Sequence, residues 1–433
     1  MKPTTEPIDI TEPFEVTAGT AVAGGRCLAR HEGKVVLVSG ALPGERVRVR
    51  VTKDEKRYAE AEVTEILEPN PRRREAPCAH AADCGGCDWQ YAERDLQLEM
   101  KRGIVIDAFR RLGELDVQEQ LEGPSEVGEE FRTRQRIRLS FDPAGRPGLL
   151  RRGTHDVVPI DGCLQMEASF DEVTLPWVRL LPPWKKVTVR HDDEGHVVLA
   201  LESGKPANEK DRKRFGKITK KMERPPSVVG LLADAVPLAG ERTLRFHVQG
   251  KVFRADATSF FQGSRPGTIE LLDTVNEFLG DDRQGTLLDL YAGVGLFAVT
   301  MGKGFRQVVA TEADARAVKH LKYNLKRHAV RAEARAESAE VTLAGKAAEG
   351  EAEAETVILD PPRIGLTREA RRALVARSPR RIVSISCDPA TGARDAGVLV
   401  RAGWKLERLR AIDLFPTTAH VETVALLVRP PVG

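Results

Sequence analysis

A strand followed at once by a glycine-rich turn restricts the fold of this chain more than any other feature. In the segment GTLLDLYAGVGLFAV, residues 285–299, an apolar run leads to Gly293 and Gly295 and then to a second apolar run. Glycines after a buried strand let the backbone approach a ligand closely. Strand and helix patterns alternate from about residue 245 to the end of the chain. Together these features predict a Rossmann-like α/β domain with a parallel sheet.

The acidic residue after the next strand helps to identify the ligand of this domain. Glu312 ends the run QVVATE, nineteen residues after Gly293, where an acidic side chain binds ribose hydroxyls. The dinucleotide fingerprint G-x-G-x-x-G is not met, because Ala298 occupies its last position, and there is no phosphate-binding lysine motif. The pattern D-x-x-x-G-x-G favours S-adenosylmethionine, a cofactor without phosphate. A sheet that binds no cofactor is the alternative.

Three other strand termini carry groups that can react. The run ETVILDPPR ends in Asp360, where amino-methylating enzymes carry D/N-P-P-Y/F, and Arg363 in place of the aromatic residue argues against an amine target. The run IVSIS delivers Cys387 to a strand end, where a thiol is a candidate nucleophile, although a free cysteine is more often a small buried hydrophobe. Glu422 stands at the start of the last strand, either as a base or as an exposed edge residue.

Four of the six cysteines are spaced as ligands of one metal centre. Cys78, Cys84 and Cys87 follow C-x5-C-x2-C, and Cys163 lies in a distant turn, DGCL. Four thiolates without a nearby histidine fit a 4Fe-4S cluster or a structural zinc. The C-x3-C-x2-C spacing of radical enzymes is not met, and zinc sites more often use two C-x2-4-C pairs, of which the chain has one. The pattern therefore favours a fully ligated iron–sulfur cluster over zinc.

The length and charge of the chain limit its class and its partners. At 433 residues it is too long for one ordinary core, so two or three domains are expected. No apolar run is long enough for a membrane span and the N-terminus has no secretory signal, so we expect a cytoplasmic protein. The net charge is only +3, but basic residues gather at 131–140, where arginines alternate, and at 210–224. These stretches favour a side that faces a polyanion, or are solvated faces of a strand and a helix.

Five segments together resemble the RNA uracil-C5 methyltransferases. They are SCDPATGARD, DPPR, DLYAGVG, FFQ at 260–262 and HVE at 420–422, and the resemblance covers nearly the whole chain. It implies that Cys387 is the nucleophile and Glu422 the base. The positions that match the family's S-adenosylmethionine site are Gln262, Tyr291, Gly293, Glu312 and Asp360. The four cysteines resemble the iron–sulfur cluster ligands of the family.

The resemblance also implies a division into three domains. Residues 1–68, which read as five short strands with glycine corners, resemble the RNA-binding TRAM barrel. Residues 69–94 and 127–240 would form a β-rich central domain with the cluster. Residues 95–126 and 241–433 would form the methyltransferase domain, closed by an antiparallel hairpin near the C-terminus. A linker helix is expected from about residue 92 to 112, where Gly113 ends it.

The sequence departs from the family pattern beside the nucleophile. The family usually has the sequence S-C-N-P, whereas Asp388 follows Cys387 here. A negative charge beside the thiol would raise the pKa of the thiol. A helix that starts after Pro389 would act in the opposite direction. Two further departures are Ser264 and Leu296, at positions that are asparagine in family members.

The chemistry of the family explains why these residue types are needed. C5 of uracil is a poor nucleophile until a thiolate adds at C6, and a base must then remove the C5 proton so that the thiol leaves. The barrel and the cluster together resemble ribosomal-RNA enzymes more than transfer-RNA enzymes. We therefore expect a monomeric enzyme that acts on ribosomal RNA, with no membrane partner. A transfer-RNA enzyme, a catalytically impaired assembly factor and an amino-group methyltransferase are the alternatives.

Overall fold

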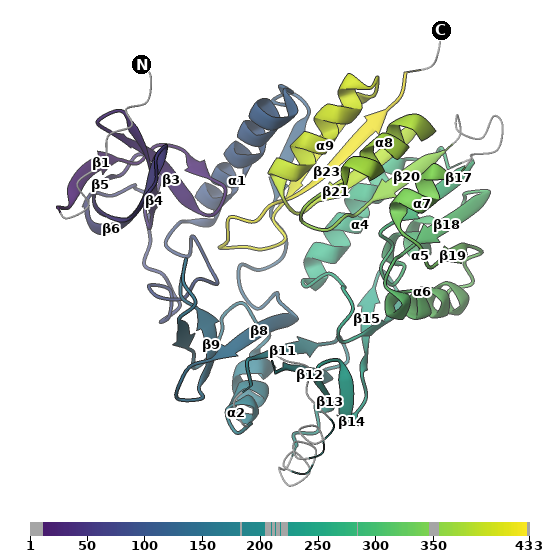
Figure 1. The fold of residues 1–433 in the computed structure, drawn as a ribbon, viewed down its shortest axis with the longest axis horizontal. Helices are drawn as coiled ribbons and strands as arrows, with labels where there is room; N and C mark the ends of the chain where they lie inside the picture. The colour runs from purple at the N-terminus through teal and green to yellow at the C-terminus, as the bar shows by residue number, and fades with distance from the viewer. Residues whose placement is uncertain are drawn as a thin grey trace.

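The structure is a computed structural model that shows a small barrel, a central β-rich unit and a large helix-covered sheet (Figure 1). It describes residues 12–181, 184–203, 224–283, 285–345 and 355–430, with positions 209, 213 and 217. The second basic stretch and the low-complexity run at 344–355 lie almost entirely outside these residues. Among the described helices, none combines the length and the apolar character that crossing a membrane requires.

The barrel has one strand more than the sequence predicted. Within residues 12–68, all of them described, six strands pair in the order β1-β5-β6-β4-β3-β2. Their bounds are Phe14–Thr17 (β1), Ala21–Val22 (β2), Arg26–His31 (β3), Lys34–Ser39 (β4), Arg46–Asp54 (β5) and Tyr58–Glu68 (β6). Val47 and Val49 fill the interior, because alternate residues of a strand point to one face. Arg48 and Arg50 point outward and form ion pairs with glutamates of β6, so the charge on the outer face of β5 is largely neutralised.

The long helix after the barrel ends differently from the prediction. α1 (Arg94–Ala108) continues into the π-helical turn η1 (Phe109–Gly113), and the left-handed residue that ends it is Glu114, at φ 58°. Gly113 has another role. A Cβ at Gly113 would lie 2.8 Å from the carbonyl oxygen of Ala393, so the glycine allows this turn to pack closely on α9 (Pro389–Arg401).

The central unit is an antiparallel sheet with one parallel pair. Its described strands pair in the order β10-β9-β8-β11-β12-β13-β14, and β12 and β13 are parallel. The bounds are Arg136–Phe141 (β8), Pro147–Leu150 (β9), Val157–Pro159 (β10), Lys186–His191 (β11), Val197–Glu202 (β12), Val228–Ala233 (β13) and Val236–Gly240 (β14). One face packs on η2 (Phe170–Thr174) and α2 (Leu175–Val178). The hairpin β15 (Thr243–Val248) and β16 (Lys251–Asp256) follows.

The large sheet has the predicted Rossmann-like topology. The order is β19-β18-β17-β20-β21-β23-β22-β7, parallel except for β23, which is antiparallel to both neighbours. The bounds are Leu121–Ser125 (β7), Thr286–Leu290 (β17), Gln307–Thr311 (β18), Glu333–Arg335 (β19), Thr356–Leu359 (β20), Arg381–Ser386 (β21), Lys405–Ile412 (β22) and Glu422–Val428 (β23). The antiparallel C-terminal hairpin is confirmed as β22–β23.

Helices cover both faces of this sheet. They are α4 (Arg265–Leu279), α5 (Leu296–Met301), α6 (Ala315–Arg327), α7 (Ala339–Ala344), α8 (Arg368–Arg377) and α9. Successive residues of one strand enter different cores: Leu426 belongs to one cluster and Leu427 to the other. A strand buried on both faces reads as a continuous apolar run, which is why the sequence revealed it. The domain boundaries given above stay a prediction.

Candidate active site

The glycine turn after β17 meets the acidic residue after β18. Gly293 and Gly295 have φ of 55° and 93°, and the N–H of Gly293 donates to Glu312 Oε2 at 3.0 Å. A Cβ on Gly295 would lie 2.6 Å from Leu321 Cδ1 of α6, whereas one on Gly293 would meet no described atom within 4 Å. Gly295 is therefore required by packing, and Gly293 leaves space for a ligand. Tyr291 begins the turn, with a left-handed φ of 63°.

Asp289 is a candidate site residue that the sequence motifs did not single out, although it is the first position of D-x-x-x-G-x-G. It is fully buried on β17, and its Oδ2 accepts the N–H of Ala298 at 2.8 Å. Its Oδ1 has no hydrogen-bond partner among the described residues. Burial raises the pKa of Asp289 to about 7, with smaller contributions from Asp360 and Glu312. An unpaired buried carboxylate is unfavourable, so a cationic ligand would stabilise it.

Asp360 follows the neighbouring strand β20 and faces the same region. Burial raises its pKa to about 7. Gln262, buried in the loop between β16 and α4, donates from Nε2 to Asp360 Oδ2 at 3.4 Å. The loop FFQ and the loop DPPR, which are 98 residues apart, therefore meet at one point.

The antiparallel pairing of β21 and β23 brings Cys387 beside Glu422. Ser386, the last residue of β21, pairs with Thr423 in this register. Cys387, which follows β21, therefore lies level with Glu422, the first residue of β23. The side chain of Glu422 is buried, and burial, followed by Asp360, raises its pKa well above the ordinary value. These groups are 35 residues apart in the sequence. Their meeting places a thiol and a carboxyl group side by side at one end of the sheet.

The thiol of Cys387 lies in an acidic environment. Its pKa is raised to about 11, first by burial, then by Glu422 and Asp360, while Arg363 acts in the opposite direction. Asp388 also raises the thiol pKa, but it contributes least of the named causes. Its carboxylate caps α9, accepting the N–H of Ala390 at 2.9 Å, and lies 3.6 Å from Arg363 Nε. The predicted effect of Asp388 therefore has the right sign but is secondary.

The predicted metal ligands line one cavity. Cys78, Cys84, Cys87 and Cys163 surround a space of about 160 Å³. Four thiolates in tetrahedral contact with zinc, at about 2.3 Å each, would place their sulfurs less than about 4 Å apart. No three of the cysteine sulfurs, all of them described, lie within 4.8 Å of one another. The described sulfurs therefore do not have the spacing of a tetrahedral zinc site.

The arginines at 131–140, which predicted a polyanion-facing side, and those that follow up to Arg152 mostly have acidic or aromatic partners. Ion pairs are formed by Arg132 with Asp171, Arg138 with Glu202, Arg146 with Asp142, Arg151 with Asp83 and Arg152 with Asp88. The guanidinium of Arg134 lies 5.1 Å from the ring centre of Phe415. Arg134, Arg136 and Arg138 line the cysteine cavity. The alternating arginines therefore indicate a strand beside the cysteine cavity as much as an external basic surface.

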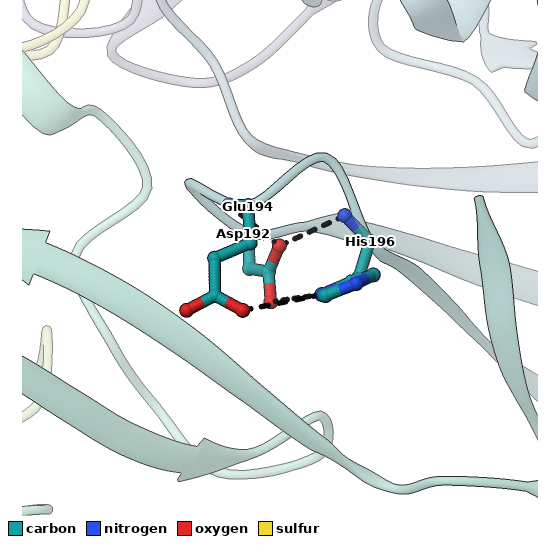
Figure 2. A group of neighbouring side chains, drawn as sticks. All are labelled: Asp192, Glu194 and His196. Atoms are coloured by element: carbon teal, nitrogen blue, oxygen red, sulfur yellow. Dashed lines mark hydrogen bonds and ion pairs between the residues drawn. The ribbon is translucent and has the colours of Figure 1, made fainter.

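A separate group of potential metal ligands lies at the turn between β11 and β12 (Figure 2). Asp192 Oδ1 accepts the N–H groups of Glu194 and His196, each at 2.9 Å, and Oδ2 lies 3.3 Å from His196 Nδ1. The N–H of Arg245 also donates to Oδ2, at 3.0 Å. Because Asp192 already satisfies these turn groups, we assign the cluster a structural role in the hairpin.

Comparison with known proteins identifies the family. A model of the tRNA (uracil-5-)-methyltransferase family matches residues 240–430, and a TRAM domain model matches residues 15–64. The 23S rRNA (uracil(1939)-C(5))-methyltransferase of Aeromonas hydrophila is 30% identical over 418 residues, covering 93% of each chain. The chain belongs to the RNA uracil-C5 methyltransferase family. It is therefore an S-adenosylmethionine-dependent RNA (uracil-C5-)-methyltransferase.

Further relatives of this uracil-C5 methyltransferase agree in extent and in fold. An uncharacterized RNA methyltransferase of Streptomyces coelicolor is 33% identical, and the match covers 98% of this chain and 95% of the relative. The crystal structure of Pyrococcus abyssi tRNA (uracil-54, C5)-methyltransferase in complex with S-adenosyl-L-homocysteine superposes with a TM-score of 0.72 at 22% identity. That match covers 95% of this chain and 99% of the Pyrococcus chain, so the two share a fold along nearly their whole length.

Proposed function

We propose that the protein methylates C5 of a uridine in 23S ribosomal RNA through a covalent bond between Cys387 and C6, with Glu422 as the base. The observation that carries the proposal is the position of the two groups, level with each other at the ends of β21 and β23. The buried carboxylates Asp289 and Asp360 lie within electrostatic reach of one another, and Asp360 also raises the pKa values of both Cys387 and Glu422.

Each step of the proposed reaction uses a group of this site. The Cys387 thiolate adds to C6, and the electron pair of the C5–C6 double bond makes C5 nucleophilic. S-adenosylmethionine, when bound, supplies the methyl group and departs as the neutral thioether. Glu422 then takes the C5 proton, the C5–C6 double bond re-forms, and the sulfur of Cys387 leaves. The base must leave its stack to reach the thiol, which suits a loop nucleotide.

The cofactor would bind across the carboxyl ends of β17, β18 and β20. Glu312 would accept hydrogen bonds from the ribose hydroxyls, and Tyr291 and Gly293 would lie against the nucleoside. Gln262 and Asp360 would contact the part of the cofactor nearest Cys387. The carboxyl groups whose pKa values lie near 7 favour a ligand with a positive charge, which the sulfonium has.

We expect the affinity for S-adenosylmethionine to rise with pH between about 6 and 8. Asp289 and Asp360, with pKa values of about 7, are mostly neutral at the lower pH and ionised at the upper, and only the ionised forms attract the sulfonium. Each carboxyl group that must ionise for binding raises the affinity up to about tenfold over this pH range. Calorimetric titration at several pH values measures the affinity and its slope with pH. S-adenosylhomocysteine, which lacks the sulfonium charge, should show a smaller slope, and an unchanged slope in Asp360→Asn would contradict the assignment.

We also propose that the four cysteines hold a 4Fe-4S cluster, which would tie residues 78–87 to the turn at Cys163. Protein purified without oxygen should be brown and contain about four iron and four sulfide per chain. Cys163→Ser should lower both, whereas Cys27→Ala, a fully buried cysteine of the barrel, should leave them unchanged. Zinc in place of iron in the metal analysis would overturn the proposal.

Ribosomal RNA is favoured as the substrate because the relative that matches 93% of both chains at 30% identity is a 23S rRNA enzyme. The test is to map 5-methyluridine in RNA from a strain that lacks the gene. We expect one or more sites in 23S RNA to lose the methyl group, and the purified protein to restore it in vitro. Loss of the methyl group from transfer RNA instead would support the transfer-RNA alternative. If 5-methyluridine were unchanged in all RNA of the strain, and the protein formed no covalent adduct with 5-fluorouridine RNA, an assembly factor would be supported.

A further inference from the structure

The loop that delivers Glu422 is fastened to the cysteine-bearing segments. Residues 413–421, which we call the strap, join β22 to β23 and reach from the large sheet toward the barrel (Figure 1). At the β22 end, Asp413 is fully buried and forms ion pairs with Arg94 and Lys101 of α1. Lys101 Nζ also donates to the carbonyl oxygen of Phe415 at 3.0 Å. The first half of the strap is thus anchored on α1.

Thr417 is the central residue of the strap. It is fully buried and has a left-handed φ of 62°, which is unfavourable for a β-branched residue unless its surroundings impose it. Its carbonyl oxygen accepts the N–H groups of Asp88 and Trp89, each at 2.8 Å, and its own N–H donates to Gln97 Oε1 at 2.8 Å. Its Oγ1 accepts from Gln165 Nε2 at 2.9 Å. These four hydrogen bonds hold the residue in its conformation.

The partners of the strap are neighbours of the cysteines on both sides of the cavity. Asp88 directly follows Cys87, and Gln165 lies two residues after Cys163. Asp88 makes a second contact, because its Oδ2 accepts the N–H of Ala419 at 2.8 Å. Ala419 is only three residues before Glu422. The two cysteine segments therefore meet on the strap just before the chain enters β23.

We propose that the cysteine centre positions Glu422 for removal of the C5 proton, with Gln165 and Thr417 as positioning residues that act through the strap. The inference rests on the proposed function, since it assumes that Glu422 is the base. It separates two steps of the reaction. Addition of the Cys387 thiolate to C6 depends on β21 and α9, and neither element is part of the strap. Elimination depends on the Glu422 carboxylate, and the strap leads directly into the strand that begins with Glu422.

The experiment compares adduct formation with adduct decay in Gln165→Met and Thr417→Val. Both substitutions keep the side-chain volume nearly unchanged and remove the hydrogen bond between Gln165 and Thr417. Adduct formation is measured with 5-fluorouridine RNA, and decay is measured with ordinary RNA and labelled S-adenosylmethionine as loss of the methylated protein–RNA band. We expect decay to slow by about 10- to 100-fold, because small displacements of a reacting group have effects of this size, while formation changes by less than about twofold.

Three further proteins serve as controls. Thr417→Ser keeps the hydroxyl and should restore decay to within about threefold of the wild-type rate. Thr174→Val removes the hydroxyl of a fully buried threonine on η2 that has no hydrogen-bond partner among the described residues, and should match the wild type in both steps. Iron content and absorbance spectrum should be unchanged in Gln165→Met and Thr417→Val. Cys87→Ser should lose iron and also slow the decay.

Each outcome leads to a definite conclusion. Equal slowing of formation and decay would show that the strap is merely structural, and wild-type rates for both steps would show that it positions nothing. Slow decay in Cys87→Ser together with fast decay in Gln165→Met would exclude the strap as the route. If the wild-type protein formed no adduct with 5-fluorouridine RNA, the proposed function itself would be wrong. Should Thr417→Val not fold, Gln165→Met and Thr417→Ser still decide the question.

Discussion

Cys387→Ala should abolish the covalent adduct with 5-fluorouridine RNA and lower methyl transfer by about 10⁴-fold or more. The size follows from the chemistry: without a nucleophile at C6, C5 of uracil does not become nucleophilic, and no neighbouring side chain supplies a substitute thiol. Gel electrophoresis under denaturing conditions measures the adduct, and a single-turnover assay measures transfer. Binding of S-adenosylmethionine should be retained, because the glycine turn and Glu312 are untouched.

The matched control for this variant is Cys27→Ala. Cys27 is a fully buried thiol of the barrel, and its Sγ donates to the carbonyl oxygen of Ala41 at 3.3 Å, so its substitution tests the loss of a cysteine away from the sheet. This variant should methylate RNA at the wild-type rate. Methylation by Cys387→Ala at the wild-type rate would refute covalent catalysis and would revive the amino-group alternative.

Glu422→Gln should accumulate the methylated protein–RNA adduct and slow turnover by about 10²- to 10⁴-fold. The amide keeps the shape of the side chain but does not accept the C5 proton, so the reaction stops after methyl transfer. Adduct formation should not be slowed. Among the nearby charges, the Glu422 carboxylate contributes most to the raised pKa of Cys387, so its removal favours the thiolate at neutral pH.

Glu407→Gln is the corresponding control, since Glu407 lies exposed on the adjacent strand β22. It should turn over at the wild-type rate and leave no adduct on ordinary RNA. If Glu422→Gln lost formation and decay together, Glu422 would be needed for the shape of the site and another group would be the base.

The aspartate beside Cys387 does not by itself indicate an inactive protein. Asp388 accepts hydrogen bonds from the N–H groups of Ala390 and Thr391 at the start of α9 and lies near Arg363. A carboxylate is a good N-cap, and its charge is partly compensated there. The stronger influences on the thiol pKa are burial and the two carboxyl groups Glu422 and Asp360.

Local patterns were sufficient where one segment carries the whole signal. The strand and turn at 286–295, the strand that ends at Cys387 and the spacing of three cysteines all follow from residues adjacent in the chain. Strands buried on both faces are continuous apolar runs, and a glycine turn is visible directly. The sequence by itself therefore determined the fold class, and it predicted a cofactor region and a candidate nucleophile.

The arginines show where local patterns fail. Arg138 belongs to the stretch that predicted a polyanion-facing side, yet Glu202 on β12, two strands away in the central sheet, forms an ion pair with it. Such pairing depends on strand register, which residues on one strand do not reveal. Gly113 was read as a helix end for the same reason, because its close contact with Ala393 is made by a helix that is distant in the sequence.

Only the tertiary structure decided which distant residues lie together. It placed Glu422 level with Cys387 through the register of β21 and β23, and it brought Gln262 to Asp360. It also placed Thr417 between the neighbours of Cys87 and Cys163, so the segment that leads to Glu422 is hydrogen-bonded to both cysteine segments. Strand order and loop contacts join residues that are far apart in the chain, so residue spacing and composition do not predict these contacts. The glycine turn and the thiol at a strand end depend on adjacent residues, and the sequence therefore reveals them directly.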